Sequence, residues 1–135
     1  MRTAYITHAA FQQHDTGSAH PECASRLYAI EDQLIATGLR DVLRYVDAPE
    51  VTAEQLLRVH TLAHVETVSA KIPEVGYDRL DPDTVVSPSS LVAAYRAAGA
   101  VVEAVDLVAT GKMDTAFCAV RPPGHHAESS RAMGF

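Results

Sequence analysis

The chain has 135 residues, and 47% of them are hydrophobic, which is enough to bury the core of one ordinary domain. Acidic residues outnumber basic ones by 17 to 11, and the charge of −6 excludes the overall basic surface typical of nucleic-acid-binding domains. No stretch approaches the roughly 20 predominantly apolar residues that cross a bilayer, and the N-terminal residues make a poor signal peptide. We therefore expect neither a nucleic-acid partner nor membrane association.

The two cysteines, Cys23 and Cys118, are too few for a disulfide framework in a chain of this length. Cys118 lies within an apolar run, where we expect a buried free thiol. Both features favour a reducing environment, so we expect the protein to be cytoplasmic.

The first part of the chain predicts a strand, a long loop, a helix and a second strand. Residues 3–7 are β-prone, whereas residues 8–22 are polar and predict a loop of the length that often carries function. Residues 42–46 predict the second strand. Between loop and strand, apolar residues recur with the period of an amphipathic helix, and a glycine follows at the position of a C-terminal cap; these residues are Leu27, Ile30, Leu34, Ile35 and Gly38.

The middle of the chain predicts two short helices and a loop. Thr52 and Gln55 have the spacing of a capping box, which opens the first of these helices. The second is expected over residues 64–71. Residues 73–82 contain two prolines and a glycine, and we expect them to form a loop.

A long helix and a last strand complete the pattern. Ser87 followed by Pro88 predicts the start of a helix that ends before Gly111. Residues 115–120 are almost continuously apolar, which indicates a strand buried on both faces and central in its sheet. Strands therefore alternate with helices, and this alternation predicts an α/β fold with a mainly parallel sheet.

Two neighbouring histidines follow the last strand, at the sheet edge where ligands bind in α/β folds. Two prolines stiffen the segment 121–126, and Gly124 permits backbone angles that other residues avoid. A turn is needed for His125 and His126 to face one site, because neighbouring side chains of an extended chain point in opposite directions. Imidazoles perform acid–base catalysis, bind metals and make structural hydrogen bonds, and the residues alone leave these three roles open.

The segment Arg-Pro-Pro-Gly-His-His-Ala at 121–127, with Ala-Met-Gly-Phe at 132–135, resembles the signature of zinc-dependent histone deacetylases. It is most similar to the class II-like branch that includes bacterial histone deacetylase-like amidohydrolases and acetylpolyamine amidohydrolases. Weaker similarities follow the family's order along the chain, at His20-Pro21-Glu22, Arg26-Leu27, Leu80 to Thr84 and Ser87-Pro88. Ala24 departs from the branch, which often has proline there.

The resemblance implies a three-layer α/β/α sandwich that is incomplete in this chain, with residues 1–135 forming the N-terminal part of a single deacetylase catalytic domain. It implies hydrolysis of acetyl amides on lysine side chains or polyamines, assisted by Zn²⁺. His126 resembles the general base and acid, and His125 resembles the residue that stabilises transition-state charge. The other positions carried over are tunnel residues (Gly124, Gly134, Phe135), an arginine of the internal cavity (Arg26) and rim residues (His20, Asp81, Asp83).

The family's zinc ligands and its transition-state tyrosine match segments C-terminal to Phe135, so the resemblance implies no metal ligand in this chain. We therefore expect residues 1–135 alone to be inactive and to form a homo-oligomer or to bind a complementing C-terminal segment. Two alternatives stay open: a truncated, non-catalytic binding module of the same family, and a manganese-dependent hydrolase similar to arginase.

Simpler interpretations apply to several of these residues. His60 and His64 would be surface or capping residues, because the zinc-binding pattern they resemble has a glutamate where Thr61 stands. The loop histidines His8, His14 and His20 would be rim or solvated residues rather than ligands. Arg26 could form an ordinary surface ion pair, Asp81 and Asp83 could stabilise a turn, and Phe135 could belong to the core.

Overall fold

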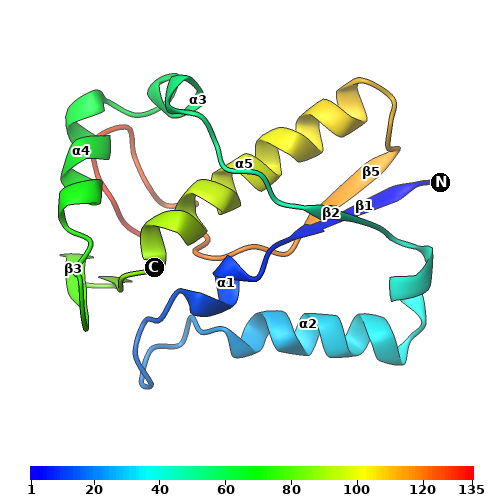
Figure 1. The fold of residues 1–135 in the computed structure, drawn as a ribbon, viewed down its shortest axis with the longest axis horizontal. Helices are drawn as coiled ribbons and strands as arrows, with labels where there is room; N and C mark the ends of the chain where they lie inside the picture. The colour runs from blue at the N-terminus through cyan, green and yellow to red at the C-terminus, as the bar shows by residue number, and fades with distance from the viewer.

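A parallel sheet formed by β1 (Thr3–Thr7), β2 (Arg44–Asp47) and β5 (Thr115–Cys118) lies at the centre of the computed structural model, which describes all of residues 1–135 (Figure 1). The strand order is β2-β1-β5, so β1 is the middle strand. Both of its neighbours run parallel to it, with Tyr5 opposite Tyr45 and Phe117. The predicted class, α/β with a mainly parallel sheet, is confirmed.

Two long helices cover opposite faces of this sheet, α2 (Ser25–Ala36) on one side and α5 (Ser90–Ala109) on the other (Figure 1). Side chains alternate along β1, so Tyr5 faces α2 while Ala4 and Ile6 face α5. These β1 residues are almost entirely buried and share one core cluster with residues of both helices, among them Leu27, Ala93, Ala97 and Ala100. The layers are thus helix, sheet and helix.

Shorter elements connect these layers. They are α1 (Ala10–Gln13), the 3-10 helix η1 (Leu39–Val42), α3 (Ala53–Leu57), α4 (Leu62–Ala70) and the antiparallel pair β3 (Asp78–Asp81) and β4 (Thr84–Val86). The capping box of Thr52 and Gln55 is present at the start of α3. Gly38 follows α2 with φ of +71°, the left-handed conformation expected after a helix end. No helix is long and apolar enough to span a bilayer.

Several predicted boundaries are wrong. Strand β3 lies inside the stretch 73–82, which was expected to be a loop. It forms a strand because residues 78–81 pair with β4, which was not predicted either. The second strand begins at Arg44 rather than 42, because η1 occupies the residues after Gly38. The long helix begins at Ser90 and not at Ser87, whose hydroxyl accepts a hydrogen bond from the amide of Asp15 at 3.1 Å.

The last strand differs most from its prediction. It ends at Cys118 and lies at the edge of the sheet, so it is neither central nor buried on both faces. Phe117 stacks on Tyr5 with ring centroids 6.1 Å apart, yet it stays 49% exposed. The Cys118 thiol is free and only partly buried; burial raises its pKa, and it contacts the carbonyl oxygen of Ala100.

We expect residues 1–135 to self-associate through the β5 edge, because an exposed strand edge beside apolar side chains favours pairing between chains. Phe117→Lys should shift the population toward monomer in analytical ultracentrifugation. Val75→Lys, in an exposed loop outside the sheet, is the matched control and should leave the distribution unchanged. A monodisperse wild-type monomer at high concentration would contradict this expectation.

Candidate active site

The two motif histidines lie side by side in a turn beyond the carboxyl end of β5. Pairing with β1 continues past the strand, since the Ala119 amide donates to the carbonyl oxygen of Ile6 at 2.9 Å. Gly124 has φ of +61°, and the Ala127 amide donates to its carbonyl oxygen at 3.0 Å. This turn encloses His125 and His126, whose ring centroids are 4.4 Å apart and both of which are exposed. The turn that we expected before the two histidines, so that both could face one site, is therefore present.

The C-terminal residues fold back over this pair. Gly134 has φ of +86°, and a Cβ atom at that position would lie 2.7 Å from the Cβ of His126. Glycine is therefore needed here for both conformation and space. Phe135 next to it contacts the ring of His20 edge-on, with centroids 5.2 Å apart.

Two of the candidate rim residues, His20 and Asp83, line an open groove of about 750 Å³ together with Phe135, whereas Asp81 does not line it. The His20 ring contacts the backbone carbonyl oxygen of Asp83 through Nε2 at 3.1 Å. Asp81 accepts a hydrogen bond from the Asp83 amide at 2.8 Å, and hydrogen bonding from Thr84 lowers the pKa of its carboxyl. The turn-stabilising interpretation of Asp81 is therefore confirmed. The Asp83 carboxylate makes no hydrogen bond or ion pair, so the same interpretation is not confirmed for Asp83.

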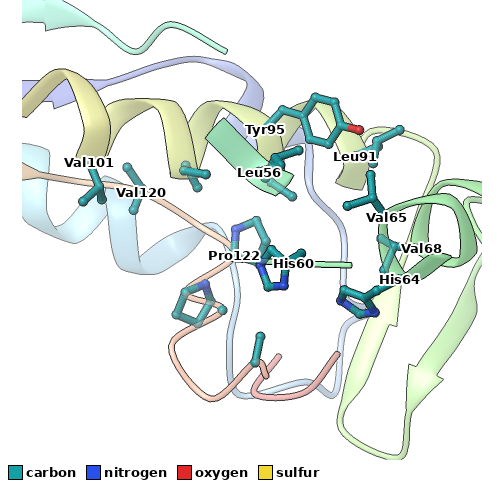
Figure 2. A pocket seen from close by; sticks show the side chains of 16 residues that line it. Leu56, His60, His64, Val65, Val68, Leu91, Tyr95, Val101, Val120 and Pro122 are labelled. Carbon is teal, nitrogen blue, oxygen red and sulfur yellow. The ribbon is translucent and has the colours of Figure 1, made fainter. Parts of the chain in front are cut away.

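Of the three candidate tunnel residues only Phe135 lines this groove, and neither Gly134 nor Gly124 does. Gly124 lines the wall of a different, mostly apolar cavity of about 300 Å³. This cavity lies between α4, α5 and the turn (Figure 2). His60 and His64 lie side by side on the same wall, with ring centroids 5.2 Å apart. His60 precedes α4 rather than belonging to it, and Thr61 caps that helix. Burial, and then the charge of His60, lower the pKa of His64.

His60 also connects α4 to the segment that follows the two motif histidines. Its Nδ1 lies 3.1 Å from the carbonyl oxygen of Glu128, and the Thr61 amide donates to the carbonyl oxygen of Ser129 at 3.0 Å. His60 is therefore a backbone-binding residue rather than a free surface histidine.

Arg26 is exposed, and its guanidinium group binds backbone. Its Nη2 donates to the carbonyl oxygen of Val120 at 2.6 Å and lies 3.7 Å from a carboxylate oxygen of Glu22. It also borders an apolar groove of about 520 Å³ that contains Tyr5 and Phe117. The interpretation as an ordinary surface ion pair is incomplete, because the shortest contact is to the chain just before the motif.

Arg121 and Glu22, to which the sequence patterns assign no role, form a buried ion pair. Arg121 is 0% exposed, and its Nε and Nη2 donate to the two carboxylate oxygens of Glu22 at 2.8 and 2.9 Å. Its Nη1 donates at 2.6 Å to the carbonyl oxygens of both Phe11 and His14. The available signal was a charged residue directly after an apolar strand, which is a place where charge needs a partner.

His14 is buried, so its interpretation as a solvated or rim residue is wrong. Its Nδ1 lies 2.7 Å from the hydroxyl oxygen of Ser90, and its Nε2 has no hydrogen-bond partner. Burial, and then the positive charge of Arg121, lower the pKa of His14 from 6.5 to about 4. The ring is therefore neutral at pH 7.

No three histidine, cysteine, aspartate or glutamate side chains come close enough together to hold a metal ion. Two imidazoles at the motif are the nearest approach to a donor set there, and a catalytic zinc site takes three protein ligands. The residues of this chain therefore do not fit a complete zinc site.

The chain is similar to several known proteins over most of its length. Residues 20–135 match the family model described as the histone deacetylase domain. Histone deacetylase 5 of Arabidopsis thaliana is 37% identical over 131 residues, covering 91% of this chain and 20% of that protein. A histone deacetylase-like amidohydrolase of Pseudomonas aeruginosa is 36% identical over 115 residues, covering 85% of this chain and 29% of that protein.

Among solved structures, the crystal structure of the HDA15 HD domain matches with a TM-score of 0.91 and 33% identity. The match covers 99% of this chain and 39% of that one. The chain thus spans less than half the length of these relatives.

The buried His14 predicts a pH dependence of stability. Its unfolded form binds a proton near pH 6.5 and its folded form only near pH 4, so the unfolded state binds more protons between these values. The free energy of unfolding should therefore fall as the pH is lowered through this window, by up to about 3 kcal/mol. It should be fully recovered above pH 6.5.

Urea denaturation from pH 7 to pH 4 measures this effect, with His14→Gln as the comparison because glutamine does not titrate. The difference in unfolding free energy between the two proteins should change in favour of the variant as the pH falls. A difference that is constant across the window would show that His14 is not held neutral.

Proposed function

The chain belongs to the histone deacetylase family, and from that premise we propose that it supplies the two-histidine part of the active site of a zinc-dependent amidohydrolase. The reaction is removal of acetyl groups from acetyl-lysine or acetylpolyamine amides. We propose further that residues 1–135 form the N-terminal part of a single catalytic domain. The observation that carries the proposal is the pair of exposed imidazoles, 4.4 Å apart, in a turn at the carboxyl edge of a parallel sheet.

The two imidazoles divide the proton chemistry between them. His126 acts as the general base that takes a proton from the attacking water and as the acid that returns it to the leaving amine. His125 lies in contact with His126. It stabilises the charge that develops in the transition state on the carbonyl oxygen and on the attacking water. A neutral imidazole both accepts and donates hydrogen bonds, which suits each ring to its role.

Zinc supplies Lewis-acid activation of the acyl carbonyl in such a reaction. Because residues 1–135 do not fit a complete zinc site, the proposal places the ligands in polypeptide outside these residues. Residues 1–135 alone are then inactive. The same observation favours a second candidate, a non-catalytic binding module of the family.

The substrate is proposed to enter beside Phe135, whose ring contacts the methylene groups of the lysine or polyamine stem, with Gly134 allowing the close approach. His20 and Asp83 lie in the same groove and are proposed to contact the substrate at its rim, next to Asp81. Arg26 is proposed to line an internal cavity for acetate release, consistent with its place beside the apolar groove.

In the complete enzyme, His126→Ala should lower kcat on an acetyl-lysine peptide by about 10²–10⁴-fold, because the general base is lost. The zinc content, measured by atomic emission, should not change. His64→Ala, which removes an imidazole from the neighbouring cavity, is the control and should keep most of the activity.

Near-normal turnover of the His126→Ala enzyme would contradict the assignment. Stoichiometric zinc bound to residues 1–135 alone after dialysis would contradict the placement of the ligands. A complete enzyme that binds acetyl-lysine without turning it over would favour the binding module.

A further inference from the structure

We propose that Glu22 and Arg121 are positioning residues: their buried ion pair fixes the start of the segment 121–127 and so aligns the imidazoles of His125 and His126. This inference rests on the proposed function of the two histidines. It concerns residues that do not touch the substrate themselves.

The hydrogen bonds of Arg121 show that its orientation is set from several sides. Its two bonds to the Glu22 carboxylate form a planar fork, and its bonds to the carbonyl oxygens of Phe11 and His14 hold the opposite nitrogen. The guanidinium group is rigid and planar, so this set of acceptors defines its direction as well as its position. The acceptors come from α1, from the residue that ends it and from the loop before α2.

A contribution to stability alone does not explain such a pair. Buried ion pairs lose much of their attraction to the desolvation of both charges, and apolar residues of similar volume often serve stability as well. What an apolar pair lacks is a defined direction. The ion pair of Glu22 and Arg121 therefore serves to orient the chain at the position where the segment 121–127 begins.

That orientation can be transmitted to the histidines over a short distance. Pro122 and Pro123 follow Arg121 directly and have restricted φ angles, so few freely rotating bonds separate the guanidinium from His125. Upstream, Arg26 binds the Val120 carbonyl oxygen at 2.6 Å and lies 3.7 Å from the same Glu22 carboxylate. Glu22 thus organises both arginines that hold the entrance to the turn.

The other end of the segment is anchored independently. His60 and Thr61 bind the carbonyl oxygens of Glu128 and Ser129 at 3.1 and 3.0 Å. With both ends held, a displacement of Arg121 has to be absorbed within the turn that contains the two histidines. The expected consequence is a change in the relative position of the rings and in the contact between His126 and Gly134.

Nuclear magnetic resonance on the 135-residue chain tests this without requiring activity. The readouts are the imidazole chemical shifts of His125 and His126 and the nuclear Overhauser effect between the His126 ring and the Gly134 α-protons. Glu22→Gln keeps the side-chain shape but loses the charge and one acceptor. We expect it to shift both imidazole signals and to reduce the Overhauser effect at least twofold.

Two controls separate positioning from general stability. Glu31→Gln breaks the ion pair between Glu31 in α2 and Arg40 in η1, whose atoms are 2.7 Å apart. Leu107→Ala removes buried side-chain volume from α5 and destabilises the core. Both variants should keep the wild-type signals of His125 and His126 while folded.

Glu22→Asp is the second test variant, because it keeps the charge and changes only the reach of the carboxylate. It should fold and should move the two imidazole signals in the same direction as Glu22→Gln, by a smaller amount. Unchanged signals in a folded Glu22→Gln or Glu22→Asp chain would overturn the proposal. Equal changes in Leu107→Ala would also overturn it, since they would show a general loss of packing.

In the complete enzyme, Glu22→Gln should lower kcat roughly 10- to 100-fold, because small misplacements of catalytic groups have effects of that size. KM should change less than twofold, since Glu22 does not line the substrate groove and Glu22→Gln leaves its backbone contacts with His20 and Thr16 in place. Wild-type kcat together with altered imidazole signals would overturn the positioning role. Failure of His126→Ala to lower kcat would instead contradict the proposed function, whatever the resonance result.

Discussion

A guanidinium group that has no contact with water must find an acceptor inside the protein for its N–H groups, and Arg121 is such a group. Its requirement explains why the polar N-terminal loop folds inward. Glu22 turns its carboxylate toward the end of β5, and the carbonyl oxygens of Phe11 and His14 are left free of helical hydrogen bonding to accept from the same side chain. The same arrangement buries His14, whose imidazole stays neutral beside the arginine.

This contact joins the N-terminal loop to the segment that carries the two motif histidines. Strand β1 carries the N-terminal loop at its carboxyl end, and the parallel β5 carries the two histidines at the same edge. Parallel pairing therefore brings residues more than a hundred positions apart in sequence to one surface. The hairpin of β3 and β4 adds Asp83 and Arg79 to the groove beside Phe135.

The chain presents two exposed imidazoles and an open groove beside Phe135, but its own side chains form no cluster of metal ligands. Its sheet has an open edge at β5, next to the partly exposed Phe117. Both facts agree with the comparison in which the chain covers 39% of a solved domain of the same fold.

Local patterns in the sequence sufficed for much of this description, because they depend on neighbouring residues. The period of apolar residues predicted α2, the capping box predicted the start of α3, and the alternation of elements predicted the parallel sheet. The specific segment 121–127 identified the family and the two histidines. Predictions that required a partner from elsewhere were wrong or missing, as for β3 and β4.

What only the tertiary structure decided is which polar groups are buried and with whom. A charged or polar residue has the same appearance in sequence whether it faces water or a partner a hundred residues away. Ser87 has the sequence features of a helix cap but binds the loop at Asp15, and the exposed edge position of β5 follows from its single neighbour. By itself the sequence determined the local elements and the reactive residue types; long-range pairing determined the Glu22–Arg121 contact, because burial depends on the whole fold.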